Sequence, residues 1–505
     1  MKSRTKTAVL ANIKSSAVYY IVIYALKFLM RMVFLKTLAM EYLGIHGLLT
    51  NILAMLSLAE LGVGPAIVYS LYKPLAFRNY ESVKSIMRLF KRVYIFIGCF
   101  IFSLGLLLYP FLDFFIKDST SIKDLNSFYV VFLMNTSISY FWSYQRNLLI
   151  ADQKQYLVNT YQMAVQTLVV VLQILTLFIS QSYWGYIILM LLGTIVENLI
   201  IDKRARREYP YITQNADPID DEIKRQIIKN ASAMIIHKIA GMLVFSTSNL
   251  IISKFVGLIA VGLYSNYYMV INALNTLSNK LFEAITASVG HLVLLENDSN
   301  KVTTFKLVQF GTAVQASIIT VCLFVLLDDF IKLWLGGDYV LDKFTVKCIV
   351  ILFYMTYMRK SILTFRDACG LFWYDRYKAI AEAILNPIIA VFLTIKYGIV
   401  GVILSSILTT IFISLWVEPY VLFRFGIPMK LDTYFLDYLK FSICTLASIV
   451  ISDAVYAFVK FSFFGLVFGG LVCFIVTMLA WIIAFRKREE LIYYRNRFGL
   501  FLDRN

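Results

Sequence analysis

Cysteine, histidine and charged residues are scarce in this chain. Among its 505 residues are six Cys and three His, and only 16% of the residues are Asp, Glu, Lys or Arg. The cysteines lie in or beside apolar segments without a CxxC spacing, and the histidines are scattered along the chain. The sequence therefore predicts neither a disulfide framework nor a metal site, and we expect no cofactor.

Apolar residues take the place of the missing polar ones. Hydrophobic residues make up 60% of the chain and its mean hydropathy is +0.73, which is typical of a polytopic membrane protein. Apolar runs of about twenty residues predict an all-α fold with fourteen transmembrane helices. They lie near residues 15–38, 43–70, 93–116, 126–148, 157–180, 183–202, 231–256, 260–286, 306–327, 345–365, 377–396, 398–421, 436–459 and 462–485.

The net charge of +17 is distributed unevenly between the two sides of the predicted bundle. With the N-terminus inside, Lys and Arg concentrate in the inner segments, so both termini are predicted to be cytoplasmic. The basic stretch before Ser15 lacks a small-residue cleavage site and is expected to stay attached. The basic loop from Lys73 to Arg92 suits contact with anionic membrane lipids, and we expect no nucleic-acid partner.

Large polar domains are absent from the predicted topology. The longest outer loop, Asp328 to Lys347, spans only about twenty residues. A membrane enzyme such as a polysaccharide polymerase or glycosyltransferase would need a larger outer loop or a cytoplasmic nucleotide-sugar domain with paired acids. We therefore expect a protein that is not an enzyme and has no catalytic residues.

A charged interval with two prolines, residues 203–230, separates two halves that resemble each other. GLLTN at Gly47–Asn51 is echoed by GLYSN at Gly262–Asn266. A six-plus-six repeat would place such an echo in helices two and eight. The predicted parts are an N-lobe (1–202), a cytoplasmic linker (203–230), a C-lobe (231–424), and two peripheral helices with a cytoplasmic tail (425–505).

Two cations near the middle of the first apolar run need a physical reason. At about 1.5 Å per residue, Lys27 lies about 18 Å along the helix, and Arg31 follows one turn later. A charge at a helix centre costs about 2.5–3.5 kcal/mol. Because the i, i+4 spacing puts both on one face, we interpret that face as the wall of an aqueous cavity.

The second half also carries cations within its predicted spans. Lys238 has no acid one turn away in its own helix, whereas Lys280 could pair with Glu283. Asn249 follows Lys238 on the same helical face. We take Lys238, Lys280 and Asn249 as candidates for substrate binding, together with Lys27 and Arg31, and Glu283 as a candidate for gating or coupling.

The second predicted span is interrupted by Gly62, Gly64 and Pro65. Transporters use such breaks for binding or bending, although a simple kink is the alternative. Glu60, one turn earlier, is either a coupling or gating carboxylate or a partner for a cation such as Lys73. Pro65 and Glu60 are therefore gating candidates.

Amides recur along one face of the fifth predicted span. The residues are Asn159, Gln162, Gln166 and Gln173, at i, i+3, i+7 and i+14. They could bond neighbouring helices, or they could donate to sugar hydroxyls in the cavity. Gln162 and Gln166 are the two that we take as substrate-binding candidates.

Four stretches carry a resemblance to a known family: Glu41–Ala76 (EYLGIHGLLTNILAMLSLAELGVGPAIVYSLYKPLA), Tyr144–Tyr156 (YQRNLLIADQKQY), Gly262–Ile271 (GLYSNYYMVI) and Leu333–Tyr339 (LWLGGDY). Almost end to end, the chain resembles the Wzx-type polysaccharide flippases of O-antigen and capsule synthesis. These belong to the MOP superfamily, which includes the flippase MurJ and the MATE multidrug exporters. Where such sequences often read STDN, residues 246–249 read STSN and lack the acid.

The resemblance implies two pseudo-symmetric six-helix lobes around a central cavity, plus two peripheral helices. It implies an undecaprenyl-diphosphate-linked oligosaccharide as substrate, moved from the inner to the outer leaflet of the bacterial plasma membrane by alternating access. A polysaccharide polymerase, assembly proteins and coupling to H⁺, Na⁺ or the membrane potential are further expectations. An organic-cation exporter on the same scaffold is the alternative, and it would require deep carboxylates.

Overall fold

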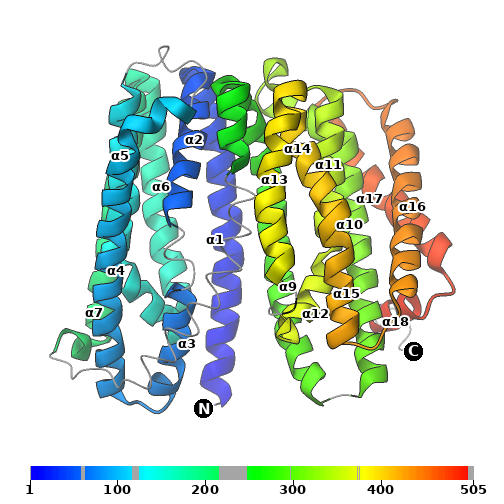
Figure 1. Ribbon diagram of the computed structural model, residues 1–505, viewed down its shortest axis with the longest axis horizontal. Helices are drawn as coiled ribbons and strands as arrows, with labels where there is room; N and C mark the ends of the chain where they lie inside the picture. The colour runs from blue at the N-terminus through cyan, green and yellow to red at the C-terminus, as the bar shows by residue number, and fades with distance from the viewer. Residues whose placement is uncertain are drawn as a thin grey trace. The chain divides into compact units, whose positions relative to one another are not determined.

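The computed structural model describes residues 2–57, 63–115, 124–214, 247–295, 297–371, 374 and 376–498 (Figure 1). These residues form helices joined by short turns, and no β-strand occurs among them. The predicted all-helical class is confirmed for this part of the chain.

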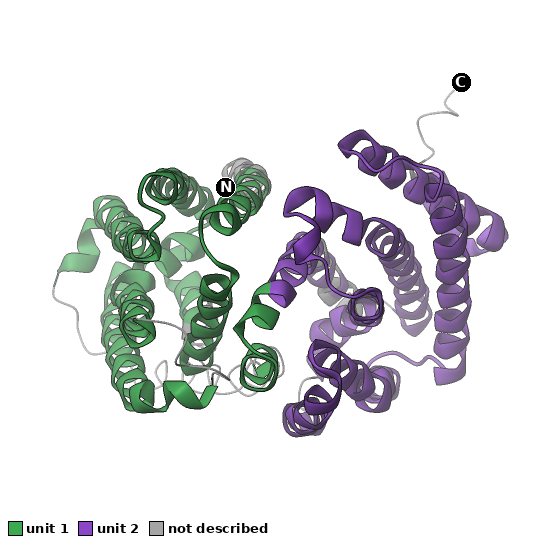
Figure 2. Ribbon diagram, turned by 90° about the horizontal axis from the view of Figure 1, so that it is seen from above, with its two compact units in different colours: residues 1–262 green, residues 263–505 purple. Residues whose placement is uncertain are grey.

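The chain forms two compact units, residues 1–262 and residues 263–505 (Figure 2). The boundary falls inside the long helix α9, Leu258–Leu295. Besides the start of α9 and a helical segment at 247–255, unit 1 contains α1 (Lys2–Thr37), α2 (Met40–Leu56), α3 (Val63–Ala76), α4 (Tyr80–Leu108), η2 (Tyr109–Phe115), α5 (Leu125–Ala151), α6 (Gln155–Ser180), α7 (Tyr183–Glu208) and η4 (Pro210–Thr213).

Unit 2 takes the rest of α9 and the helices that follow it. They are α10 (Asp298–Trp334), η5 (Gly337–Tyr339), α11 (Lys343–Met358), α12 (Lys360–Ala368), α13 (Arg376–Tyr397), α14 (Ile399–Thr409), the π-helical turn η7 (Thr410–Ser414), α15 (Leu415–Phe425), α16 (Leu431–Tyr456), α17 (Phe463–Phe485) and α18 (Glu489–Phe498).

Ten helices among the described residues are long and apolar enough to cross a membrane. The chain is therefore a multi-pass membrane protein. Two further predicted spans, 126–148 and 260–286, coincide with α5 and α9, which are 27 and 38 residues long. The number fourteen stays a prediction, because parts of three predicted spans lie outside the described residues.

Several helices begin where a polar side chain caps the first turn. Asn79 accepts a hydrogen bond from the Ser82 backbone N–H at 3.0 Å, at the start of α4. Ser182 does the same for Gly185 at the start of α7, at 3.3 Å. These caps satisfy backbone donors that the helix itself leaves unpaired, so the local sequence defines where the helices begin.

Two predicted spans of unit 2 are not single α-helices. The span 345–365 breaks at Arg359, between α11 and α12, and the span 398–421 contains the π-helical turn η7. Pro419 lies one turn beyond η7 and cannot donate a backbone hydrogen bond to the carbonyl of Leu415. Irregular backbone of this kind often accompanies functional positions in helices.

The last two long helices are part of the core of unit 2. Phe310 of α10 packs against Trp481 of α17, with ring centroids 5.3 Å apart, and Trp481 packs against Phe441 of α16 at 5.2 Å. The Ser317 and Thr445 hydroxyls form a buried hydrogen bond of 2.6 Å between α10 and α16. Aromatic packing and a buried polar contact therefore hold the C-terminal pair on α10.

Candidate functional site

The two cations near the middle of the apolar part of α1 lie in different environments. Lys27 is exposed, its Nζ lies 5.3 Å from the Tyr24 ring centroid, and no acidic side chain in the described part of the chain pairs with it. Arg31 is half-buried and interacts electrostatically with Tyr186 of α7 and His46 of α2. Within unit 1, one of these two cations thus lies at the surface and the other among aromatic rings.

A partly buried ion pair joins α5 to α7 in unit 1. Arg146 Nη2 lies 2.7 Å from Glu197 Oε1 and 3.2 Å from Asn198 Oδ1. Gln162 Nε2 donates to Glu197 Oε1 at 2.9 Å, and Gln166 Nε2 donates to Glu197 Oε2 at 3.2 Å. One carboxylate therefore receives one guanidinium and two amides from neighbouring helices, an arrangement that compensates its burial.

The amide stripe of α6 is used in contacts within unit 1. Besides the two glutamines on Glu197, Asn159 donates to the hydroxyls of Ser15 and Ser16 in α1, each at 3.0 Å. Gln173 donates to the backbone carbonyl of Tyr186 in α7, also at 3.0 Å. The four amides bond neighbouring helices, which was the first of the two alternatives.

Unit 2 contains a second buried charge cluster. Arg359 binds Glu418 through two hydrogen bonds, Nε to Oε2 at 2.8 Å and Nη2 to Oε1 at 2.6 Å. Lys378 Nζ lies 2.5 Å from the same Glu418 and 3.2 Å from Glu382, which also accepts from Ser414. Glu418 is fully buried, so both cations are needed to offset its desolvation.

The two clusters occupy matching places in the two halves. Tyr144 and Arg146 correspond to Tyr357 and Arg359, so both halves contain a Tyr-x-Arg sequence. Gln162 and Gln166 correspond in the same way to Lys378 and Glu382. The number of residues between the two members of each pair is nearly the same as the number between GLLTN and GLYSN. The difference is less than one helical turn. The acids, Glu197 and Glu418, are both on the last helix of their half.

Lys360 is a further buried cation of unit 2. It is 9% exposed, its Nζ donates to Asn279 Oδ1 at 2.9 Å, and it lies 4.5 Å from the Tyr357 ring centroid. No acidic side chain in the described part of the chain pairs with it. Lys360 and Lys27 thus differ from Arg146, Arg359 and Lys378, whose charges are matched by glutamates.

Five of the predicted site residues lie outside what the structure describes. The backbone and side chain of Glu60 and Lys238 are not described, nor are the side chains of Pro65, Lys280 and Glu283. Asn249 is described, and its buried Oδ1 has no hydrogen-bond partner there. No cluster of three or more His, Cys, Asp or Glu in the described ranges could hold a metal ion.

The six charged residues of the two clusters were overlooked among the predicted site residues, although all of them fall inside predicted spans. They are Arg146, Glu197, Arg359, Lys378, Glu382 and Glu418. Listing every charge inside the apolar runs and comparing the two halves in register would have found them. The signal is the Tyr-x-Arg pair, because arginines at matching positions inside apolar spans are costly unless each has a counter-charge.

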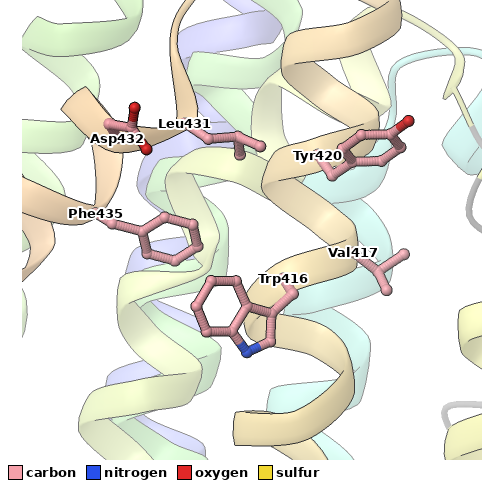
Figure 3. Close-up of a pocket in the computed structure, with 6 residues that line it drawn as sticks. All are labelled: Trp416, Val417, Tyr420, Leu431, Asp432 and Phe435. Atoms are coloured by element: carbon pink, nitrogen blue, oxygen red, sulfur yellow. The ribbon is translucent and has the colours of Figure 1, made fainter.

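Figure 3 shows a surface pocket of unit 2 between the first half of α15 and the start of α16. Its volume is about 350 Å³, and it is lined by Trp416, Val417, Tyr420, Leu431, Asp432 and Phe435. Its lining is mostly apolar and includes no cation. It therefore suits an apolar chain better than a phosphate group.

Comparison with known proteins gives a fold but no sequence family. No protein-family model and no curated protein sequence matches the chain. The solved structure of the lipid II flippase MurJ, in an inward closed conformation, matches with a TM-score of 0.65 and 15% identity, over 95% of this chain and 99% of that one.

Multidrug transporters share this fold. An inward-facing multidrug resistance MATE family transporter of the MOP superfamily matches with a TM-score of 0.63 and 13% identity, over 79% of this chain and 94% of that one. A mutant of the Vibrio cholerae MATE transporter VcmN matches with a TM-score of 0.57 and 12% identity, over 84% and 98%. The chain therefore has the fold common to MATE transporters and MurJ.

Proposed function

We propose that this protein is a flippase for undecaprenyl-diphosphate-linked oligosaccharides, working by alternating access in a bacterial plasma membrane for the synthesis of capsule or another surface polysaccharide. The fold is similar to that of MurJ, which is a lipid II flippase, and this similarity supports a lipid-linked substrate. The similarity to MATE transporters supports transport across a membrane in general.

The observation that carries the proposal is the balance of charge inside the helices. In unit 1, Arg146 neutralises Glu197; in unit 2, Arg359 and Lys378 neutralise Glu382 and Glu418. Lys27 is left without an acid among the described side chains, in the middle of the span Val18–Thr37. Among the described side chains, Lys27 is thus an uncompensated positive charge at this depth, which suits an anionic substrate.

A diphosphate needs such cations to enter a membrane protein. Its negative charges are strongly hydrated, and their transfer into hydrocarbon without compensation is prohibitive. Lys27 and Arg31, one turn apart on α1, would replace part of that hydration with charge-assisted hydrogen bonds. Lys238 and Lys280 are proposed to contribute from the second half. A few cations in a wet cavity also let the substrate leave again.

The same charge balance disfavours the alternative, an exporter of organic cations. Such a protein would present free carboxylates to its substrate. The deep glutamates of the two clusters, Glu197, Glu382 and Glu418, each contact Lys or Arg within 3.2 Å. To bind one of these glutamates, an organic cation would have to displace the Lys or Arg side chain that already contacts it. Because the fold is also that of MATE multidrug transporters, an exporter of organic cations is the second candidate function.

The test is to replace the chromosomal gene with a variant and to measure surface polysaccharide. We expect Lys27→Gln to lower surface glycan by about tenfold or more, because it removes a charge-assisted hydrogen bond to the diphosphate. Lipid-linked repeat units should accumulate in the inner leaflet. Immunoblots of membranes would show whether the variant is inserted in normal amounts.

Lys36→Gln is the matched control, because Lys36 is exposed and lies in the last turn of the same helix. It should export glycan at the normal rate. Normal export by Lys27→Gln, Arg31→Gln and Lys238→Gln, each at normal abundance, would refute the proposal. Resistance to organic cations that disappears when the gene is deleted, with no change in surface glycan, would favour the exporter instead.

A further inference from the structure

Lys360 carries a buried ammonium group that has one hydrogen-bond acceptor among the described side chains. Its Nζ has three N–H groups, and one of them binds Asn279 Oδ1 at 2.9 Å. The ammonium also lies 4.5 Å from the Tyr357 ring centroid and 5.5 Å from that of Phe282. Aromatic faces stabilise the positive charge but accept no strong hydrogen bond from it.

The partner of Lys360 belongs to a polar stripe on α9. Asn272, Thr276 and Asn279 follow one another at i, i+4 and i+7, so they share one face of the helix. Both asparagines are exposed, and all three residues fall within the predicted span 260–286. Exposed amides at membrane depth are tolerated where they line a water-filled space, so this face of unit 2 is expected to be wet.

The equivalent position in unit 1 carries no charge. Asn147 follows Arg146 as Lys360 follows Arg359, and its Nδ2 donates to the Tyr94 hydroxyl at 3.1 Å. A neutral amide is therefore sufficient next to the arginine of the partly buried ion pair. The lysine of unit 2 adds a charge that the packing around this arginine does not require.

We infer that Lys360 of unit 2 is a substrate-binding residue that contacts the diphosphate of the lipid-linked substrate, beside the exposed Asn279. The inference rests on the proposed function. An oxygen of the diphosphate accepts a hydrogen bond from an N–H of Lys360 that does not bind Asn279. The diphosphate thereby meets a cation whose burial strengthens the attraction.

The experiment titrates the purified full-length protein with undecaprenyl diphosphate and measures bound lipid by native mass spectrometry. We expect Lys360→Gln to weaken binding by about tenfold or more, and Lys360→Arg to retain more affinity than Lys360→Gln. Lys396→Gln is the matched control, since Lys396 also lies beside an aromatic ring but is exposed at the end of α13. It should bind like the unmodified protein.

Two further ligands identify the source of the phosphate. Inorganic diphosphate that competes with the lipid only when Lys360 is present would support contact with the headgroup. Equal weakening of phosphatidylglycerol and undecaprenyl diphosphate by Lys360→Gln would overturn the inference, because Lys360 would then bind any anionic lipid.

The inference and the proposed function fail in different ways. If the unmodified protein binds undecaprenyl diphosphate and Lys360→Gln binds it equally well, only the inference is overturned. A lower melting temperature with unchanged affinity would also overturn it, because Lys360 would then be structural. If the unmodified protein binds no undecaprenyl diphosphate, the proposed function fails first.

Discussion

Arg146 in unit 1 and Arg359 in unit 2 each bind a buried glutamate. In each unit a third helix also contacts that glutamate, but it does so with different side chains. In unit 1, α6 contributes the neutral amides of Gln162 and Gln166. In unit 2, α13 contributes the charges of Lys378 and Glu382 at the matching positions. Both clusters are electrically neutral overall, so the repeat preserves the charge balance while it changes the chemistry.

The difference predicts unequal tolerance to change. Glu418 is fully buried, and two cations offset the cost of burying its charge. One of them, Lys378, also forms an ion pair with Glu382. Glu197 is less completely buried, and two of its hydrogen bonds come from neutral side chains. Removing one charge should therefore disturb unit 2 more than unit 1.

The largest effect is expected from removing the arginines. Arg359→Met leaves Glu418 to share Lys378 with Glu382, and we expect a loss of about 3–5 kcal/mol in the free energy of unfolding. Arg146→Met leaves two amide donors on Glu197, so we expect about 1–3 kcal/mol. Thermal unfolding of both variants in one detergent measures the difference. Equal losses would contradict the comparison.

The next effect comes from converting the cluster of unit 2 into that of unit 1. Lys378→Gln alone leaves two carboxylates for one arginine, whereas Lys378→Gln with Glu382→Gln restores neutrality. We expect the double variant to be more stable than the single one by about 1–2 kcal/mol. The thermal unfolding midpoints of both variants and of Glu382→Gln test this, and a double variant that is less stable than Lys378→Gln would refute the charge-balance argument.

Two glycines at matching places in the two halves give a smaller and purely steric contrast. A Cβ at Gly401 would lie 2.3 Å from the backbone carbon of Leu393, whereas one at Gly185 would lie 2.5 Å from Cγ2 of Thr176. A side-chain methyl group can move and a helix backbone cannot. We expect Gly401→Ala to cost about 1–3 kcal/mol and Gly185→Ala less, again from unfolding midpoints. A larger loss at Gly185 would show that the two turns pack differently from this description.

The smallest effect concerns the caps of two helices. Asp342 begins α11 of unit 2 and accepts from the Thr345 backbone N–H at 2.9 Å, while Ser182 begins α7 of unit 1. Burial alone would raise the pKa of Asp342, but its hydrogen bonds with Thr345 outweigh burial and hold the pKa below the usual 3.8.

A carboxylate with a lowered pKa contributes stability that is complete above its unfolded pKa and is lost as the pH falls below about 4. Melting temperatures measured between about pH 6 and about pH 3 should fall less steeply for Asp342→Asn than for the unmodified protein. Ser182→Ala should lower them by the same amount throughout, because serine does not titrate. A slope unchanged by Asp342→Asn would contradict this assignment.

Hydropathy predicted most of the helices, and the echo of GLLTN in GLYSN predicts the repeat. Apolar runs of about twenty residues identified the helices, because a helix that crosses the hydrocarbon core of a membrane must have this length and an apolar composition. The break at Arg359 could not be predicted, since neither Pro nor Gly stands there. The break leaves Arg359 bound to Glu418, and that contact depends on packing between helices far apart in the sequence.

The sequence predicts only where some of the candidate residues lie, and their role in binding stays a prediction. The deep position of Lys27 and the shared face of Gln162 and Gln166 follow from spacing alone. That both glutamines meet Glu197 depends on how α6 packs on α7, which spacing does not determine. Lys360 was not among the predicted site residues, although it directly follows the second Tyr-x-Arg sequence.

Transport by the purified protein in vesicles tests most directly whether uncompensated cations carry a lipid diphosphate. The vesicles would contain fluorescent undecaprenyl-diphosphate oligosaccharide, and its appearance in the opposite leaflet would be timed under imposed H⁺ or Na⁺ gradients. We predict transport by the unmodified protein and by Lys36→Gln, and at least about tenfold slower transport by Lys27→Gln. Equal rates for Lys27→Gln and the unmodified protein would contradict the account.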